Sequence, residues 1–223
     1  MLVINNLSFS YNGDSSLILK DINFKAERGD YISILGDNGS GKSTLLKLIL
    51  NFLKPNKGTI SIYSDKIGYV PQRFESFNSG FPITVQEVLN IHRKALRIKD
   101  ARVIDEVLST VNMMKFKKHL IGQLSGGQRQ KIFIARALMG LPELLILDEP
   151  STGIDVESQI DIYDILKHLN KHHKITIISV EHNLQAAYKN SNKIFYMSNG
   201  RGKLSSSQEF FIDHDRGDLH ATI

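Results

Sequence analysis

The fold is decided by residues 36–43, which read Gly36-Asp37-Asn38-Gly39-Ser40-Gly41-Lys42-Ser43. This stretch has the spacing G-x-x-x-x-G-K-[ST]. Glycines let the backbone bend so that successive N–H groups point at phosphate oxygens, and the dipole of a following helix adds positive charge. The stretch therefore predicts a loop that binds the phosphates of a nucleotide.

The residues on either side of this loop supply the context that the pattern needs. Residues 31–35 form a short β-rich run, and residues 42–52 carry leucine and isoleucine at helical spacing. A glycine-rich turn with an accidental lysine would not account for this position between a strand and a helix. Lys42 is expected to place charge near the β- and γ-phosphates. The Ser43 hydroxyl is suited to hold Mg²⁺, which prefers oxygen ligands and usually arrives with the nucleotide.

A second strand ends in carboxylates. Asp148 and Glu149 directly follow the apolar run 144–147, so they emerge at the mouth of a buried strand, on the side of the sheet where the phosphate loop lies. Asp148 is placed to support a hydrated Mg²⁺, and Glu149 to polarise a water that attacks phosphorus. The alternative is a solvated acidic loop that caps a core strand.

The order of elements predicts an α/β fold. Alternating or apolar runs predict strands at 2–11, 18–25, 31–35, 144–147 and 174–180, with two more within 58–70, and helical stripes lie at 42–52, 126–139 and 156–169. Asp155 is a plausible N-cap for the last of these helices. Such alternation predicts a mainly parallel sheet covered on both faces, with its chemistry in the loops after the strands.

The remaining segments look like appendages to one domain that spans residues 1–223. Residues 71–82 form a loop rich in turn-forming residues, followed by helical patterns through 111, and this suggests a helical subdomain at about 74–140. Turn residues at 12–14 separate the first two strands. A hairpin is expected around 198–200, with a polar tail at about 205–223.

Composition excludes several classes of function. The chain has 223 residues and no cysteine, which removes disulfide scaffolds, thiolate nucleophiles and iron–sulfur clusters. No run approaches the roughly 18 apolar residues of a membrane-spanning helix, and no secretory signal opens the chain, so a cytoplasmic protein is expected. The net charge of +5 permits an anionic partner and decides nothing alone.

A further loop points to a particular family. Residues 124–128 read Leu-Ser-Gly-Gly-Gln and precede a helical run, which gives a second anion site at a helix N-terminus. One nucleotide seldom needs two such cradles from one chain. The combination of residues 36–44, 124–128 and 147–155 resembles the ATPase subunit of an ATP-binding cassette (ABC) transporter, and the resemblance covers nearly the whole chain.

This resemblance implies a P-loop NTPase core with an N-terminal antiparallel β part and a helical insertion. It also implies an ATP-dependent, head-to-tail homodimer, in which the Ser125 loop of one copy closes on ATP held by Lys42 of the other. Gln72 resembles the glutamine that reaches Mg²⁺ and senses the membrane partner, and His182 resembles the switch histidine near the γ-phosphate. The implied ATP-binding residues are Tyr11, Gly36, Asp37, Asn38, Gly39, Ser40, Gly41, Lys42, Ser43, Thr44, Gln72, Ser125, Gly126, Gly127 and Gln128. Those for Mg²⁺ are Ser43, Gln72 and Asp148, and those for catalysis are Glu149, His182 and Lys42.

Single residues within this set have alternatives. Tyr11 resembles the aromatic that stacks on adenine, but an aromatic after a strand is often a core or edge residue. His182 could be a surface histidine, although it follows an apolar strand at the expected end. The chain departs from the family pattern at Asp37, at Gly153-Ile154, and at Glu181 and Asn183 on either side of His182. We expect Asp37 to face solvent.

The resemblance also suggests partners. Such a subunit docks on integral membrane permease subunits at the inner face of the cell membrane, beside Gln72 and the helical insertion, and a separate substrate-binding protein is expected. Candidate apolar contacts are Phe74, Phe77, Phe81 and Pro82, which could equally form a small core of their own. Residues 81–88 resemble the zinc and manganese uptake branch. The histidines at 168, 172, 173, 214 and 220 lack tight ligand spacing and are read as solvated surface, so the metal would be carried by the membrane partner.

Other functions stay open at this point. The chain could power an importer for another substrate, or be a soluble cassette ATPase that acts on ribosomes or DNA. Proteins of the latter kind usually carry two cassettes or a long coiled-coil insertion, and no aromatic-interleaved basic patch supports a nucleic-acid partner here. A regulator that binds nucleotide without hydrolysis is disfavoured, because Glu149 and His182 are both in place.

Overall fold

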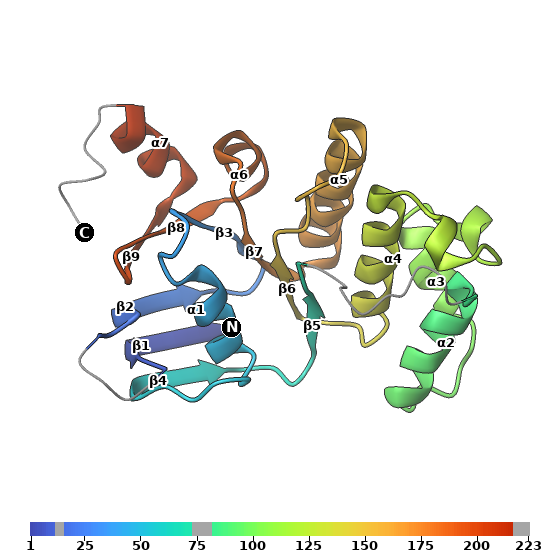
Figure 1. The fold of residues 1–223 in the computed structure, drawn as a ribbon, viewed down its shortest axis with the longest axis horizontal. Coiled ribbons are helices and arrows are strands. Elements are labelled where there is room, and N and C mark those ends of the chain that lie inside the picture. The colour runs from blue at the N-terminus through green and yellow to red at the C-terminus, as the bar shows by residue number, and fades with distance from the viewer. Residues whose placement is uncertain (12–15, 73–81, 216–223) are drawn as a thin grey trace.

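The computed structural model describes residues 1–11, 16–72 and 82–215, which form two sheets flanked by helices (Figure 1). The strands are β1 (Leu2–Phe9), β2 (Leu19–Ala26), β3 (Tyr31–Gly36), β4 (Lys57–Ile62), β5 (Ile67–Val70), β6 (Leu144–Asp148), β7 (Thr176–Val180), β8 (Lys193–Ser198) and β9 (Arg201–Ser206). The α-helices are α1 (Lys42–Ile49), α2 (Val85–Ala95), α3 (Val103–Thr110), α4 (Gly126–Leu138), α5 (Val156–His173), α6 (Leu184–Asn190) and α7 (Ser207–Asp215). Short 3₁₀ turns lie at Met114–Phe116 and Ile121–Gln123.

The sheet topology confirms the predicted fold class. One sheet has the order β2-β1-β4 and is antiparallel. The other has the order β5-β6-β7-β3-β8-β9, and every neighbouring pair in it is parallel except β8 with β9. The chain is therefore an α/β protein with a mainly parallel sheet and an N-terminal antiparallel part.

The apolar run of β6 is continuous because both of its faces are buried. Leu145 and Leu147 pack into a core that includes residues of the helices α3, α4 and α5. Leu144 and Ile146 point the other way, into a core shared with the antiparallel sheet and α1. Side chains alternate between faces along a strand, so a strand between two cores needs apolar residues at every position.

The helices α2, α3 and α4 gather at one end of the molecule, away from the antiparallel sheet (Figure 1). Helix α2 begins with a capping box, in which the Thr84 hydroxyl accepts from the Glu87 N–H and the Glu87 carboxylate accepts from the Thr84 N–H. These helices lie inside the range predicted for a helical subdomain, and its boundaries stay a prediction. The loop prediction at 71–82 and the turn prediction at 12–14 fall largely outside the described residues.

The C-terminal region differs from the expectation of a hairpin followed by a polar tail. The hairpin is present, with Asn199 and Gly200 at positive φ between β8 and β9. The tail, however, begins with helix α7, which buries Phe210. Ser206 and Glu209 form a capping box at its start, a sequence signal that the polar composition obscured.

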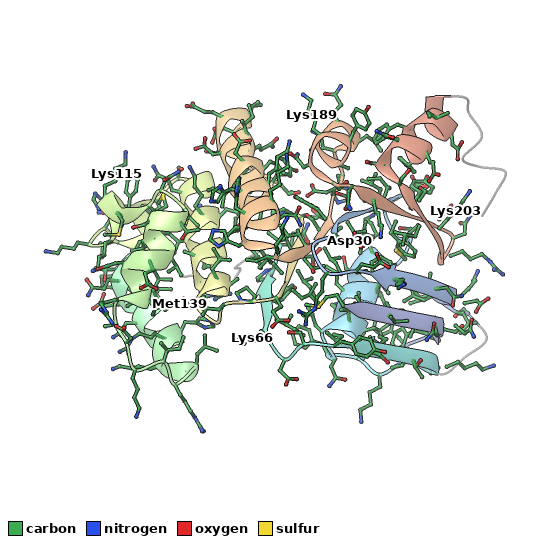
Figure 2. The ribbon with its side chains drawn as sticks, turned by 180° about the vertical axis from the view of Figure 1, so that it is seen from behind. Asp30, Lys66, Lys115, Met139, Lys189 and Lys203 are labelled. Atoms are coloured by element: carbon green, nitrogen blue, oxygen red, sulfur yellow. The ribbon has the colours of Figure 1, made fainter. Side chains whose placement is uncertain are left out.

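A buried ion pair fixes the amino end of β3 beside β8. Asp30, labelled in Figure 2, precedes β3 and accepts hydrogen bonds from Lys193 at 2.9 Å and from Asn192 at 3.1 Å. Oδ2, the oxygen that Lys193 contacts, also accepts from the Glu27 N–H at 2.7 Å, within the β2–β3 turn. Because the charge of Asp30 is paired and hydrogen-bonded, its burial is tolerated and the central strand is held in register.

None of the helices in the described ranges combines the length and the hydrophobicity that crossing a membrane would require.

Candidate nucleotide site

The predicted site residues gather where parallel strands end. Val70 of β5 is paired with Leu147 of β6, and Val180 of β7 is paired with both Asp148 and Ile34. The loops that follow these strands therefore start at the same edge of the sheet. That edge is where open α/β sheets bind ligands.

The loop after β3 needs its glycines. Gly36, Gly39 and Gly41 all have positive φ, at 143°, 83° and 100°. A Cβ on Gly36 would lie 2.1 Å from the carbonyl oxygen of Met197, which no side chain could tolerate. Helix α1 begins directly after Gly41, so the loop ends at a helix N-terminus as its sequence predicts.

Lys42 turns back over this loop. Its Nζ donates to the carbonyl oxygens of Gly36 at 2.7 Å and Asp37 at 2.9 Å, and the residue is only 6% exposed. Burial lowers the pKa of Lys42, while the negative charges of Glu149, Asp37 and Asp148 act in the opposite direction. A buried ammonium whose hydrogen bonds go to neutral carbonyls would gain from an anionic ligand such as phosphate.

Two buried oxygens at this edge have no hydrogen-bond partner among the described residues. They are the Ser40 hydroxyl, in the loop, and Oδ1 of Asp148. Burial raises the pKa of Asp148, and the nearby charge of Glu149 raises it further. Oxygens of this kind are the ligands that Mg²⁺ prefers, and a bound magnesium nucleotide would give them partners. The residues present therefore fit both a nucleotide and Mg²⁺.

The rest of the loop faces outward. Asp37, Asn38 and Ser43 are exposed, and the expectation that Asp37 faces solvent is confirmed. Ser43 and Thr44 occupy the first turn of α1, behind Lys42. The hydroxyl of Ser43 is thus accessible to a ligand held by the loop.

Glu149 is the centre of a second cluster. Its Oε2 accepts from Gln72 Nε2 at 2.5 Å and from Thr152 Oγ1 at 3.1 Å, and its Oε1 lies 2.6 Å from His182 Nε2. The Glu149 side chain is 10% exposed, and its φ of 52° is a left-handed conformation that is rare for a residue with a Cβ. Gln72, Glu149 and His182, predicted from three separate segments, meet at one point.

Thr152 was not singled out from the sequence, although it follows Glu149 by three residues. A hydroxyl at that spacing can bond back to a carboxylate in a tight turn, and this was the available signal.

Tyr11 lies next to the first turn of α1. Its hydroxyl is 3.2 Å from Thr44 Oγ1, and its ring packs edge-on against Phe9 with centroids 5.0 Å apart. The residue is 53% exposed, so it is not a core aromatic. An exposed ring beside the phosphate loop is free to stack on a flat ligand.

The Leu-Ser-Gly-Gly-Gln loop lies elsewhere in the chain. Ser125 caps α4, with its hydroxyl accepting from the Gln128 N–H at 3.2 Å and its own N–H donating to Gln128 Oε1 at 3.0 Å. A Cβ on Gly127 would lie 2.3 Å from Ser158 of α5, so glycine is needed for the packing of these helices. Gly126 is beside Ile154. Helices α1 and α4 lie on different sides of β5 and β6 in Figure 1, so one chain does not bring the loop before α4 to the loop before α1.

Comparison with known proteins gives consistent matches. Residues 19–152 match the family described as ABC transporter. The chain is 47% identical over 223 residues to a probable metal transport system ATP-binding protein of Treponema pallidum, covering 99% of this chain and 93% of that protein. It is 42% identical over 202 residues to the zinc uptake system ATP-binding protein ZurA of Listeria innocua, covering 83% and 78%.

Solved structures show the same likeness. The structure of cbiO1 from Clostridium perfringens, part of the ABC transporter complex cbiONQ, superposes with a TM-score of 0.84 at 30% identity, covering 96% of this chain and 92% of that one. A dimeric, post-hydrolysis ATP-binding cassette bound to ADP and phosphate has a TM-score of 0.78 at 28% identity, covering 93% and 99%. The likeness extends through the whole described fold.

Proposed function

We propose that this chain, which belongs to the ABC transporter family and has its ATP-binding fold, is the ATP-hydrolysing subunit of an importer for zinc or manganese. The main evidence for a metal substrate is the 47% identity, over nearly the full length of both chains, to a metal transport ATP-binding protein. The match to a zinc uptake protein supports it. We infer the direction of transport and the transported metal from these relatives. We infer the hydrolytic chemistry from the geometry of the site.

The loop around Lys42 binds ATP. Its N–H groups and the Lys42 ammonium neutralise the β- and γ-phosphates, with Gly36, Gly39 and Gly41 allowing the backbone to approach them. Tyr11 stacks on the adenine. Ser43, Gln72 and Asp148 would hold Mg²⁺, which supplies charge neutralisation at the phosphates.

Glu149 acts as the general base. Its carboxylate accepts a proton from the attacking water, the water oxygen bonds to the γ-phosphorus, and the bond to the bridging oxygen of the β-phosphate breaks. His182 and Gln72 orient Glu149 through the hydrogen bonds at 2.6 and 2.5 Å. ADP and inorganic phosphate are the products.

The working unit is a head-to-tail homodimer that forms on ATP. Because α1 and α4 lie on different sides of β5 and β6, the loop 125–128 at the start of α4 would meet the γ-phosphate across an interface between two copies. The dimeric cassette bound to ADP and phosphate supports this arrangement. Two ATP sites then share one interface.

Membrane subunits complete the transporter. The chain would bind permease subunits at the inner face of the cell membrane, beside Gln72 and the helical part, and a separate substrate-binding protein would deliver the metal. Of the proposed apolar contacts Pro82 is exposed, and Phe74, Phe77 and Phe81 lie outside the described residues.

The cargo is held by the membrane partner. Within residues 1–11, 16–72 and 82–215 no group of three metal-ligating side chains is arranged to hold an ion. His168 instead stacks with His172, with ring centroids 4.6 Å apart, on the last turns of α5. The side chain of His214 and the whole of His220 lie outside the described residues.

The cargo is tested by the metal content of cells in which a Glu149→Gln form replaces the wild-type protein. Under metal limitation we expect a selective loss of cellular zinc or manganese with unchanged iron, because the subunit binds ATP without powering transport. A strain carrying Asp65→Asn, which removes an exposed carboxylate between β4 and β5 and outside the helical part, is the control. Unchanged zinc and manganese, with ATP hydrolysis intact in the wild type, would reject the metal cargo.

A further inference from the structure

A carboxyl group that the proposed mechanism does not use is buried next to His182. Glu181 follows the last residue of β7 and is only 2% exposed. Its Oε1 accepts from Ser179 Oγ at 2.5 Å, and its Oε2 accepts from Tyr163 OH at 2.8 Å. The backbone of Glu181 is also fixed, because its N–H donates to the Ile34 carbonyl of β3.

The hydrogen bonds continue beyond Tyr163 to the segment that follows Glu149. The Tyr163 hydroxyl, on α5, lies 2.7 Å from Ser151 Oγ. Gln159 of the same helix donates to the carbonyl oxygens of Ser151 at 3.0 Å and Ile154 at 3.1 Å. Two side chains of helix α5 thus hydrogen-bond to the loop 151–154 and fix the residues just after Glu149.

These contacts close a ring around the Glu149 and His182 pair. From His182 the path runs through the peptide bond to Glu181, then to Tyr163 and Ser151, and back along the chain to Glu149. The ring closes where Glu149 Oε1 meets His182 Nε2 at 2.6 Å. Any shift of the loop that carries Glu149 relative to the loop that carries His182 would change the distance between these two side chains.

Such a network is costly unless it is fully satisfied. A buried carboxylate loses its hydration, and Glu181 is compensated by two hydroxyl donors, Tyr163 and Ser179. Satisfied networks of this kind hold one arrangement of the segments that they join. The segments joined here are those that carry the proposed base and the switch histidine.

Several titratable groups face Glu181. Tyr163 approaches from α5 and Tyr31 from β3, while His182 and Glu149 lie on the adjoining loops. The Tyr31 hydroxyl is buried and has no hydrogen-bond partner within the described part of the chain, and burial and the charge of Glu181 raise the pKa of Tyr31. Tyr31 is therefore near the same carboxyl without belonging to the network, which makes it a control.

We propose that Glu181 is a positioning residue for ATP hydrolysis, which acts through Tyr163 and Ser151 to hold His182 against Glu149. The inference rests on the proposed hydrolytic role of Glu149. A displacement of about 1 Å at a reacting group can cost ~10²-fold in rate, so the ring is able to set turnover without touching ATP.

The test compares the Glu181→Gln, Tyr163→Phe and Tyr31→Phe variants by kcat and by KM for ATP. We expect kcat to fall by at least ~10-fold in Glu181→Gln and Tyr163→Phe, with KM within about twofold of wild type, because the phosphate loop is untouched. The double variant should lose less than the product of the two single losses, since both break one network. Tyr31→Phe should keep wild-type kcat.

The pH dependence of kcat distinguishes a positioning role from a purely structural role, which would not change with the protonation of Glu181. Burial raises the pKa of Glu181 to about 7. Above that pH the carboxylate accepts from both hydroxyls, and below it one oxygen must donate, which reverses the direction of the chain. The ratio of wild-type kcat to Glu181→Gln kcat should therefore fall as the pH is lowered through about 7.

The pH dependence of folding stability is a second, independent measurement. A carboxyl whose pKa is raised on folding contributes stability that is present at low pH and is lost as the pH rises through about 7. The melting temperature of the wild type minus that of Glu181→Gln should therefore decrease as the pH rises. The same melting curves establish that each variant is folded.

Two results would overturn the inference. One is a folded Glu181→Gln variant with wild-type kcat at every pH, and the other is an equal loss in Tyr31→Phe. Glu149→Gln is assayed in parallel to keep the two proposals apart. If Glu149→Gln also retains turnover, the proposed base is wrong, whereas its inactivity beside an active Glu181→Gln removes only the positioning role.

Discussion

Replacing Glu149 with glutamine is expected to lower ATP turnover by at least ~10²-fold while ATP still binds. The amide keeps the shape of the side chain but cannot accept a proton from water. The Lys42 loop follows β3, whereas Glu149 follows β6, so we expect the loop to bind the phosphates as in the wild type. The measurement is release of inorganic phosphate under saturating MgATP, together with the affinity for ATP.

The matched control for this variant is Glu106→Gln, which removes an exposed carboxylate on α3. It should hydrolyse ATP at the wild-type rate. Trapped ATP should also make dimers of Glu149→Gln accumulate, because hydrolysis no longer separates the two copies. Near-normal turnover in Glu149→Gln would show that another group takes the proton.

Replacing Lys42 with alanine is expected to abolish ATP binding. In the proposed mechanism the Lys42 ammonium neutralises the phosphates, and a charge-assisted contact in a buried site is strong. We expect affinity for ATP to fall by at least ~10²-fold, measured by titration calorimetry. Hydrolysis should be lost with it at ordinary ATP concentrations.

The control for Lys42 is Lys54→Ala, which removes an exposed lysine close in sequence and leaves the net charge equal to that of Lys42→Ala. This control separates a local effect from the general attraction of a basic protein for an anion. Retained affinity in Lys42→Ala would mean that residues 36–43 do not form a phosphate-binding loop.

Much of the fold was predictable because it follows from local rules. The glycines around Lys42 are required by backbone angles that other residues rarely adopt, so their spacing predicted the loop, and the apolar patterns on either side predicted the strand and the helix. The alternation of strands and helices predicted a mainly parallel sheet, and the run 144–147 is apolar at every position because both faces of β6 are buried. Asp155 caps α5 as predicted, with its carboxylate accepting from the Ser158 N–H at 2.9 Å.

The contacts within the site were less predictable, because they join segments that are distant in sequence. Nothing local indicates that Gln72 reaches Glu149, or that Tyr163 reaches Glu181. The family resemblance, confirmed by the match over residues 19–152, implied Gln72 and His182 but gave no reason to choose Glu181 or Tyr163. Glu181 entered only as a departure from the family pattern, and its burial became evident from the fold.

Helices α6 and α7 were missed for a different reason. Both are short, and their apolar residues are few, so helical periodicity hardly rises above the background. Tertiary packing supplies what the local pattern lacks. Ala187 of α6 and Phe210 of α7 are buried in a small core with Leu35 and Ile194 of the sheet.

The central claim is that two copies of this chain share each ATP site, and mixing two inactive variants tests it most directly. We expect that Lys42→Ala does not bind ATP, and that Ser125→Glu places a carboxylate near the γ-phosphate bound to the other copy. A mixed dimer keeps one intact site, formed by Lys42 of one copy and Ser125 of the other. We predict that the equimolar mixture hydrolyses ATP at up to about a quarter of the wild-type rate, although each variant alone is inactive. A mixture no more active than its two components, or full activity of Ser125→Glu alone, would contradict the shared site.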